Sequence, residues 1–309
     1  MQKIVKDKNT VAFLGSSLPM LIFAYIYKKK TKSNVVILNN SQDIGGAWGL
    51  FKYKNIRIRK QSNVILPLTK KQERNQKKIN FFLKKYLNIK IQRINRIANI
   101  KYSYKNKFDY KFDNFIKLIH KLNIIKKIKV NKLRVLSNEK ILVNQKNVYD
   151  KVFFPSFFGI DKIYEKKKIT KIDFKIIKSE HIVALIKKTK FKNLFYSDFF
   201  NTFFDRVLIT KHKNFYTFSG RITKKYKGSR KNTIKKNIQK ISEDGKIIKF
   251  YKFNVINYYR DKKQIKKLKF FKRIRNIEYI NTSNFILVME QLFRYFKYKS
   301  IKSKLFLSR

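Results

Sequence analysis

The N-terminal part of the chain alternates short apolar runs with a longer apolar stretch, in an order typical of a parallel β-sheet. Residues 11–14 form an apolar run closed by Gly15, and residues 34–38 form a second run. Between them, residues 18–27 have the apolar density of a helix that packs on a core, with Pro19 acceptable in its first turn. The pattern predicts a βαβ unit whose two strands are parallel neighbours.

The same stretch admits a second interpretation, a signal peptide or membrane anchor, because residues 11–27 carry no charge. The run is short for a membrane span, which needs about 20 apolar residues. Its first half contains Gly15, Ser16, Ser17 and Pro19, and it lacks a convincing small-residue cleavage site. We therefore expect no transmembrane span and a cytoplasmic protein.

Further along the chain, the hydrophobic pattern predicts a mixture of helices and strands. Stretches with helical character are 112–125, 196–204, 234–241 and 285–296. Strand-like runs are 128–133, 140–143, 149–155, 180–186, 205–210, 214–221 and 277–280. The strand-rich part from residue 161 to 265 is interpreted as a second, β-rich domain.

Composition narrows the class of protein without fixing its function. The chain of 309 residues is 43% hydrophobic and 16% aromatic, enough for a sizeable core, and it has no cysteine. Disulfides, thiolate metal sites and cysteine nucleophiles are thereby excluded. The histidines His120, His181 and His212 lack the spacing of a metal site, and no nucleophile elbow or phosphate loop occurs.

The net charge of +59 has two explanations. Taken alone it suggests a polyanionic partner, because clustered Lys and Arg release counterions from phosphates. However, the abundant residue types Lys, Ile, Asn, Phe and Tyr all have A/T-rich codons, so genome bias explains the charge as well. The lysine-rich run at 224–240 is interpreted as a solvated loop and helix face, with a nucleic-acid or membrane-surface patch as the alternative.

Glycines are scarce but concentrated near the predicted βαβ unit. Average usage would give about 22 glycines in a chain of this length, and there are eight. Four of them lie together with the only tryptophan: Gly15, Gly45, Gly46, Trp48 and Gly49. Because glycine is required where φ is positive or where the backbone closely approaches another group, this segment is the candidate functional site.

The segment from residue 11 to residue 49 resembles the N-terminal dinucleotide-binding unit of FAD-dependent oxidoreductases. The second strand, a polar loop and Ile44-Gly45-Gly46 match that unit in spacing. The resemblance implies that the first glycine turn and the helix N-terminus bind the pyrophosphate, and that the Gly-Gly turn passes close to ribose and flavin. The residues it assigns to the cofactor here are Gly15, Ser16, Ser17, Leu18, Asn39, Asn40, Gly45, Gly46, Ala47 and Trp48.

Three positions depart from the fingerprint of the family. Ser17 and Met20 stand where the family has glycine, and Asn39 stands where it has a ribose-binding acid. We expect weaker cofactor binding as a result, with a fold that has lost its cofactor as the alternative. At least one of Gly45 and Gly46 is predicted to have a positive φ, with Ser17 at the helix entrance and Asn39 at the tip of the second strand.

The order of elements from residue 112 to 155 is similar to the middle of amine-oxidase-like and protoporphyrinogen-oxidase-like flavoproteins. The resemblance implies that the strand at 128–133 places the backbone of Val130 against the adenine. A three-stranded meander without a ligand is the alternative.

Arg57 and Arg59 follow the Gly-Gly-x-Trp turn, where similar flavoproteins, including UDP-galactopyranose-mutase-like ones, run toward their substrate. They are candidates for an anionic substrate or a pyrophosphate, with solvated strand-edge cations as the alternative. Gly-Gly-x-Trp also occurs in flavin monooxygenases, but no second dinucleotide fingerprint is present, so FAD is expected rather than NAD(P).

The resemblance implies an α/β fold with a Rossmann-like FAD/NAD(P)-binding domain and a second, β-rich α+β domain. The first is assigned to residues 1–75, 110–160 and 266–309, and the substrate or cap domain to 76–109 and 161–265. The implied function is FAD-dependent oxidoreduction or flavin-assisted isomerisation of a small organic substrate, with no metal and no catalytic residue assigned. The alternative is a basic, non-enzymatic protein that binds RNA or an anionic glycan on the same scaffold.

Overall fold

The computed structural model divides the chain into two compact units. It describes residues 9–40, 44–46, 49–54, 56–60, 70–94, 96–98, 108–137, 139–155, 159–160, 162–165, 168–171, 173, 175–189, 195–197, 203–242, 245–259, 274, 276–280, 282 and 285–296. Unit 1 comprises Met1–Gly46, Phe115–Ile176 and Tyr258–Arg309, and unit 2 comprises Ala47–Asn114 and Ile177–Asn257.

Unit 1 is built on a five-stranded parallel sheet in the order β20-β12-β1-β2-β8. Its strands are β1 (Thr10–Leu14), β2 (Asn34–Asn39), β8 (Ile125–Lys127), β12 (Lys151–Pro155) and β20 (Ile277–Ile280). The register of β1 and β2 runs from Thr10 opposite Asn34 to Leu14 opposite Leu38. The predicted parallel pair is therefore confirmed, and its uninterrupted apolar runs fit a sheet that is buried on both faces.

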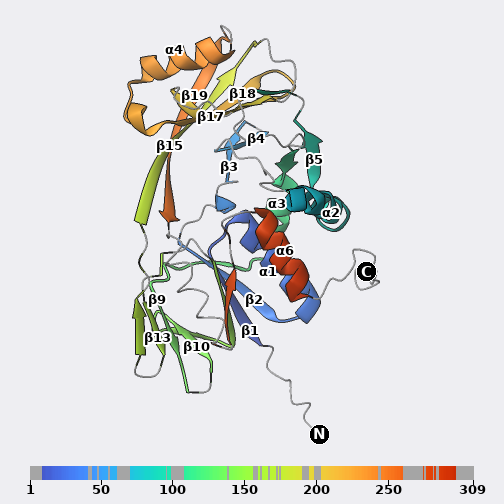
Figure 1. Ribbon diagram of the computed structural model, residues 1–309, viewed down its shortest axis with the longest axis vertical. Helices are drawn as coiled ribbons and strands as arrows, with labels where there is room; N and C mark the ends of the chain where they lie inside the picture. The colour runs from blue at the N-terminus through green and yellow to red at the C-terminus, as the bar shows by residue number, and fades with distance from the viewer. Residues whose placement is uncertain are drawn as a thin grey trace. The chain divides into compact units, whose positions relative to one another are not determined.

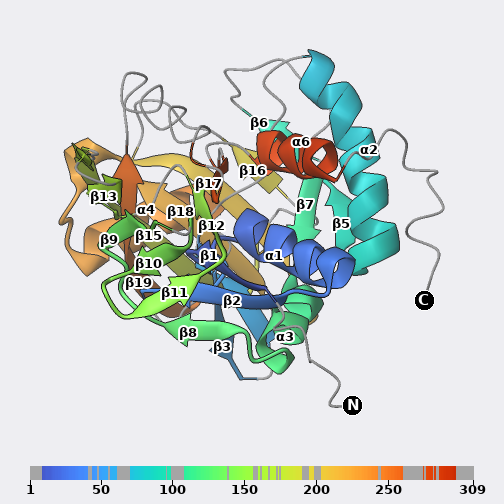
Figure 2. The ribbon, with the colours of Figure 1, turned by 90° about the horizontal axis from the view of Figure 1, so that it is seen from below.

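Helices cover one face of this sheet. α1 (Leu18–Thr31) connects β1 to β2, crosses the sheet as Figure 2 shows, and lies beside α6 (Phe285–Tyr295). α3 (Asp113–Lys121) reaches α1 through the edge-to-face contact of Phe115 with Tyr25. On the same face, the rings of Phe13 and Phe153 stack with centroids 4.3 Å apart. Burial of these aromatic and aliphatic side chains holds the helices on the sheet.

A second, mostly antiparallel sheet covers the opposite face, so unit 1 has three layers. Its order is β11-β10-β9-β13-β14, and β9, β10 and β13 are seen together in Figure 1. The strands are β9 (Lys132–Val135), β10 (Ile141–Val143), β11 (Asn147–Tyr149), β13 (Lys162–Glu165) and β14 (Lys168–Lys171). Leu133, Ile141 and Val143 pack in one buried cluster with Leu14 and Leu38 of the parallel sheet.

The strand predicted at 128–133 is wrong in its position. The structure has β8 before it and β9 from Lys132, and the residues between them are not in a strand. The Asn144 side chain holds this connection, since its Oδ1 accepts the Asn131 N–H at 2.9 Å and its Nδ2 donates to Lys129 C=O at 2.6 Å. The segment connects the parallel sheet to the antiparallel sheet, and its alternation of buried and exposed residues resembles that of a single strand.

Unit 2 is built on a six-stranded sheet in the order β19-β15-β18-β17-β16-β6. Its strands are β6 (Arg96–Ala98), β15 (Lys175–Ile186), β16 (Phe195–Ser197), β17 (Phe204–Lys211), β18 (Tyr216–Ile222) and β19 (Ile247–Tyr259). On one face α4 (Lys231–Ser242) packs Ile234 and Ile238 against the sheet. On the other face the hairpin of β3 (Leu50–Tyr53) and β4 (Ile56–Arg59) packs against Val183 and Leu185.

Unit 2 also contains elements that the hydrophobic pattern did not indicate. They are α2 (Lys70–Leu87), the paired strands β5 (Lys90–Arg93) and β7 (Phe108–Lys111), and the short 3-10 helix η2 (Lys224–Tyr226). The helix predicted at 196–204 is wrong at both ends. Phe195–Ser197 is a strand that pairs with β17, and β17 begins at Phe204. Aromatic residues favour strands when a neighbouring strand is available to pair.

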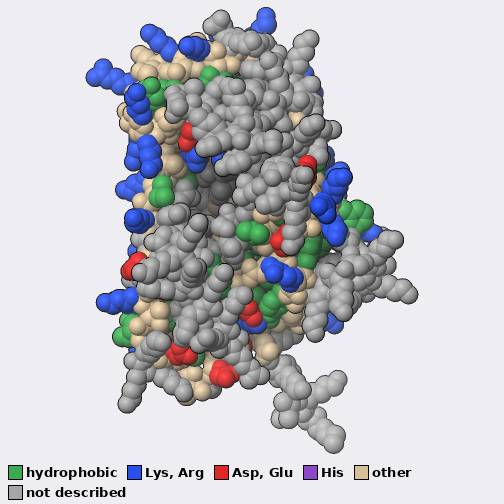
Figure 3. Space-filling view, viewed as in Figure 1, with side chains coloured by type: hydrophobic (Ala, Val, Ile, Leu, Met, Phe, Trp, Pro, Cys, Tyr) green, Lys and Arg blue, Asp and Glu red, His purple; other side chains and the backbone are tan. Residues whose placement is uncertain are grey.

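Surface properties of the described residues bear on two alternatives from the sequence, a membrane anchor and a nucleic-acid or membrane-surface patch at 224–240. None of the helices in these residues is long and apolar enough to cross a membrane. On α4, Lys231, Lys236 and Lys240 are exposed opposite the buried Ile234 and Ile238, as expected for a solvated helix face. Figure 3 shows described Lys and Arg side chains spread over the visible face rather than gathered over one element.

We expect Gly220→Ala in β18 to lower the free energy of unfolding by about 1–3 kcal/mol. A Cβ at Gly220 would lie 2.7 Å from Phe204 Cδ1 and 2.9 Å from Phe218 Cε1, and both rings are fully buried. Urea unfolding measures the effect, and Ile248→Ala at an exposed position of β19 is the control with little expected change. Equal stability of Gly220→Ala and the wild type would contradict this packing.

Candidate functional site

The candidate site of unit 1 lies at the carboxyl edge of the parallel sheet, where β1 turns into α1. Gly15 follows β1 with a φ of 82°, and its N–H donates to the Leu38 carbonyl of β2 at 2.7 Å. This hydrogen bond fastens the turn to the neighbouring strand. The N-terminus of α1 therefore begins at the edge of the sheet, where its unpaired amides and its dipole favour a negatively charged group.

The Gly45–Gly46 turn is hydrogen-bonded directly to the Gly15 turn. The Gly45 N–H donates to Ser16 C=O at 2.7 Å, and the Leu18 N–H donates to Gly45 C=O at 3.3 Å, which forms an isolated parallel bridge. Gly45 has a φ of 97° and Gly46 a φ of 55°. The prediction of a positive φ in this pair is confirmed, and it holds for both residues.

Ser17 fills the space between the two turns. A Cβ at Gly46 would lie 3.2 Å from Ser17 Cα and 3.3 Å from Ser17 Cβ, so a side chain at position 46 would press on Ser17 and require it to shift. Ser17 is the N-cap of α1, with φ −62° and ψ 148°, but its side chain makes no capping hydrogen bond. Its Oγ is buried without a hydrogen-bond partner. A buried unpaired hydroxyl costs about 1–3 kcal/mol, so this atom has an unmet capacity for a ligand.

The backbone amides at the start of α1 are partly used. The first four N–H groups of a helix have no intrahelical partner, and here they belong to Ser17, Leu18, Pro19 and Met20. Leu18 donates to Gly45, and Pro19 has no N–H. The N–H groups of Ser17 and Met20 and the Ser17 hydroxyl are the donors left for an anion at this helix terminus.

Asn39 ends β2 beside the glycine turn. It is 8% exposed, and its C=O accepts the Ile128 N–H at 2.9 Å, while Asn40 after it is exposed. The predicted positions of Ser17 at the helix entrance and Asn39 at the strand tip are confirmed. Their contact with a cofactor stays a prediction, and Ala47 and Trp48 lie outside the described residues.

Val130 lies in the connection between β8 and β9. Its side chain is 3% exposed within the core that joins the two sheets of unit 1. Asn144 engages the backbone of Lys129 and Asn131, and no hydrogen bond among the described residues involves the N–H or C=O of Val130. The contact of this backbone pair with adenine stays a prediction.

Arg57 and Arg59 belong to β4 in unit 2. Arg57 is exposed and Arg59 is half-buried. The pKa of His212 is lowered to about 4 by burial and, to a smaller extent, by the positive charges of Lys111 and Arg59. Arg59 therefore contributes to the field around His212.

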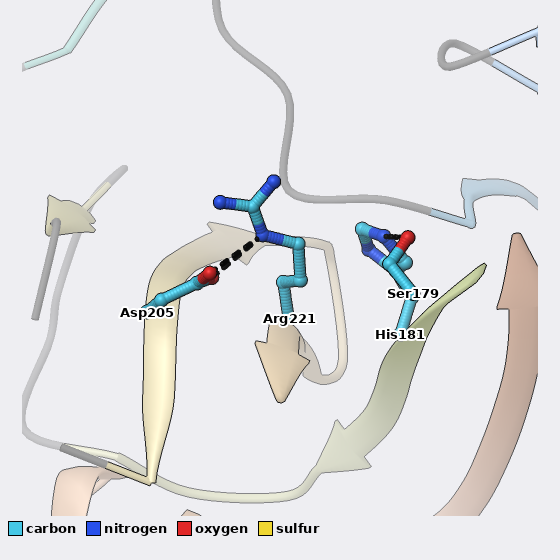
Figure 4. A network of polar contacts seen from close by, with 4 residues as sticks. All are labelled: Ser179, His181, Asp205 and Arg221. Carbon is cyan, nitrogen blue, oxygen red and sulfur yellow. Dashed lines mark hydrogen bonds and ion pairs between the residues drawn. The ribbon is translucent and has the colours of Figure 1, made fainter. Parts of the chain in front are cut away.

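A polar cluster in unit 2 was not indicated by the sequence (Figure 4). Ser179 Oγ lies 3.1 Å from His181 Nε2 on β15, and Arg221 of β18 donates from Nε to Asp205 of β17 at 2.7 and 2.9 Å. The pKa of His181 is lowered to about 3 by burial first and then by the charges of Arg221 and Arg206. These residues come from three strands, so no spacing in the sequence could bring them together. Within the described part of the chain, no group of three His, Asp or Glu side chains could hold a metal ion.

Comparisons with known proteins bear on the fold. The sequence matches no protein-family model and no curated protein sequence. The structure is similar to a putrescine oxidase bound to putrescine, with a TM-score of 0.62 and 6% identity over 93% of this chain and 98% of the other. It is also similar to a protein from Exiguobacterium sp. 255-15 assigned as a protoporphyrinogen oxidase, with a TM-score of 0.61 and 6% identity over 94% of this chain and 99% of the other.

A third similar structure is MibH, a lathipeptide tryptophan 5-halogenase, with a TM-score of 0.51 and 7% identity over 97% of this chain and 68% of the other. At these identities the similarity shows the fold alone. It confirms the predicted α/β fold, with a Rossmann-like parallel sheet and a β-rich second part. The resemblance to amine-oxidase-like and protoporphyrinogen-oxidase-like flavoproteins is confirmed at this level.

We expect the two unit 2 histidines to make stability fall as the pH drops. His181 and His212 take up a proton below about pH 6.5 in the unfolded chain, but below about pH 3 and 4 in the folded one. From about pH 7 to about pH 5, His181 alone should lower the free energy of unfolding by about 2 kcal/mol.

The variant His181→Gln should lose that part of the pH dependence, because an amide does not titrate in this range. Urea unfolding at both pH values measures it, and His212→Gln should flatten the dependence in the same direction. An unchanged pH dependence in His181→Gln would show that the imidazole is not held neutral in the folded chain.

Proposed function

We propose that unit 1 binds FAD at the carboxyl edge of its parallel sheet and that the protein is an FAD-dependent oxidoreductase or flavin-assisted isomerase of a small organic substrate. The observation that carries the proposal is the buried, unpartnered Ser17 Oγ at the N-terminus of α1. It lies where a pyrophosphate would meet the helix dipole and the remaining amides. The fold shared with the oxidases above supports the same assignment.

The described residues at this edge fit FAD, although Pro19 removes one of the amide donors that the N-terminus of α1 would otherwise offer. The Ser17 hydroxyl and the N–H groups of Ser17 and Met20 would hold the pyrophosphate. Asn39 at the tip of β2 would hydrogen-bond the ribose through its amide, and Val130 would offer its backbone N–H and C=O to the adenine. Gly45 and Gly46, without side chains, would let the cofactor pass close to the backbone.

When bound, FAD supplies the hydride transfer or the covalent chemistry, and the protein supplies orientation and electrostatics. Among the described residues, the Gly15 and Gly45–Gly46 turns would orient the cofactor, and no residue is assigned as catalytic. The division predicted from the sequence, into a cofactor-binding and a substrate domain, is part of the proposal.

We expect Gly46→Ala to weaken FAD binding about tenfold or more, because its Cβ would displace Ser17 and cost about one hydrogen bond at the pyrophosphate. Gly228→Ala is the matched control, since Gly228 also has a positive φ, of 85°, but has nothing within 4 Å of the added Cβ. Quenching of flavin fluorescence during FAD titration measures both affinities. Equal losses in the two variants would reduce the effect to backbone strain and contradict the site.

We expect Asn39→Glu to tighten FAD binding about fivefold, or by about 1 kcal/mol. A carboxylate accepts charge-assisted hydrogen bonds from ribose hydroxyls that are stronger than those of the amide. The same fluorescence titration measures it, with Asn34→Glu at the exposed opposite end of β2 as the control. Equal affinity in Asn39→Glu and wild type would remove Asn39 from the site.

One outcome would favour the alternative function over the proposed one. A wild-type protein that binds no FAD but binds RNA, with an affinity that falls steeply with salt, would identify the fold as the scaffold of a basic binding protein.

A further inference from the structure

The polar cluster of unit 2 contains an arginine that uses only one of its five N–H donors in hydrogen bonds with described residues. Arg221 donates from Nε to both oxygens of Asp205, at 2.7 and 2.9 Å, and no other hydrogen bond of its guanidinium involves a described residue. In Figure 4 its two Nη atoms point away from Asp205. The Arg221 side chain is 36% exposed, so it is partly open to solvent.

His181 stands directly opposite Arg221 across the β15–β18 pair, so the two side chains emerge on the same face of the sheet. The imidazole is 4% exposed. Its Nε2 is engaged with Ser179 Oγ, whereas Nδ1 is buried without a partner. When the Ser179 hydroxyl donates to Nε2, Nδ1 carries the proton of the neutral ring and is a buried donor that lacks an acceptor.

The charge at this place favours a monoanion. Arg221 and Arg206 lie opposite each other on β18 and β17, and Asp205 is the acidic partner in this cluster. The imidazole of His181 is neutral at physiological pH because burial and the two arginines lower its pKa to about 3. Glu180 belongs to the other face, where it accepts from Gly228 N–H and pairs with Lys252. A ligand that approaches Arg221 also meets the negative charge of Asp205, so a monoanion is favoured over a dianion.

We propose that Arg221, with His181 beside it, forms a binding site in unit 2 for the carboxylate group of a small organic ligand. The end-on pair of Nη–H groups can bind the two coplanar oxygens of a carboxylate in a bidentate way. The neighbouring negative charge of Asp205 disfavours a dianion such as phosphate. The His181 Nδ1–H supplies a further donor to one of the oxygens. The site rests on unit 2 alone and does not depend on the binding of FAD.

Selective isotope labelling of histidine tests the proposal by NMR, because the full chain has only three histidines. Sodium acetate is the probe, and sodium chloride at equal ionic strength is the reference. Acetate is expected to shift the His181 imidazole resonances in a saturable way. The resonances of His120 on α3 and of His212, which contacts Thr217 and Phe215, should move much less.

Variants on both sides of the ion pair should change the acetate affinity in opposite directions. Arg221→Lys keeps the positive charge but loses the planar, bidentate geometry of the guanidinium, so it should weaken acetate binding about tenfold. Asp205→Asn removes the competing carboxylate and should tighten binding. The double variant Asp205→Asn/Arg221→Gln removes both charges of the ion pair together and should not bind acetate. The control is Arg230→Gln, at an exposed arginine of unit 2, which should leave acetate binding unchanged.

Several results would overturn the assignment. They are equal shifts of all three histidines, the same shifts with chloride, or no saturable shift. Tighter binding of inorganic phosphate than of acetate would contradict the carboxylate class. If Arg221→Lys fails to fold, the opposite effects of Asp205→Asn and the double variant still decide the matter.

Discussion

The hydrogen-bonded contact between the Gly15 turn and the Gly45–Gly46 turn is the constraint on which the candidate site of unit 1 depends. It ties Ser16 C=O to Gly45 N–H and Gly45 C=O to Leu18 N–H. Both turns can meet this closely only because Gly15, Gly45 and Gly46 adopt positive φ values. Glycine adopts such φ values without strain, which explains why three of the eight glycines of the chain lie in these two turns.

The same contact explains how an altered fingerprint remains compatible with the fold. Ser17 adds a side chain where the fingerprint of FAD-dependent oxidoreductases has glycine, and it lies against Gly46. Met20 is fully buried in the helix that follows. As a consequence, the Ser17 hydroxyl is buried without a hydrogen-bond partner. Two of the four amide positions at the helix N-terminus are also unavailable to a ligand, because the Leu18 N–H donates to Gly45 and Pro19 has no N–H.

Much of unit 1 could be predicted from the sequence because its central strands are buried on both faces and read as unbroken apolar runs. These runs indicate β1, α1 and β2, and the glycine spacing indicates the two turns. The strand at 128–133 was misplaced because a connecting segment with alternating burial imitates a strand, and the side chain of Asn144 that holds it comes from a distant turn.

The cluster in unit 2 could not be predicted, for a different reason. His181, Arg221 and Asp205 meet only through the register of β15, β18 and β17. Strand register is a property of the folded sheet, and the intervening segments hide it from any local pattern. The aromatic stretch that became β16 was misassigned on the same ground, because pairing with β17 decided its conformation.

The central claim, that unit 1 holds FAD, is tested most directly by the visible absorption spectrum of the full chain. The protein is purified, incubated with excess FAD and separated from unbound cofactor before the spectrum is recorded. If unit 1 binds FAD, the spectrum shows the two visible flavin bands, shifted from those of FAD in solution, at a stoichiometry near one cofactor per chain. A colourless protein after this treatment would contradict the claim.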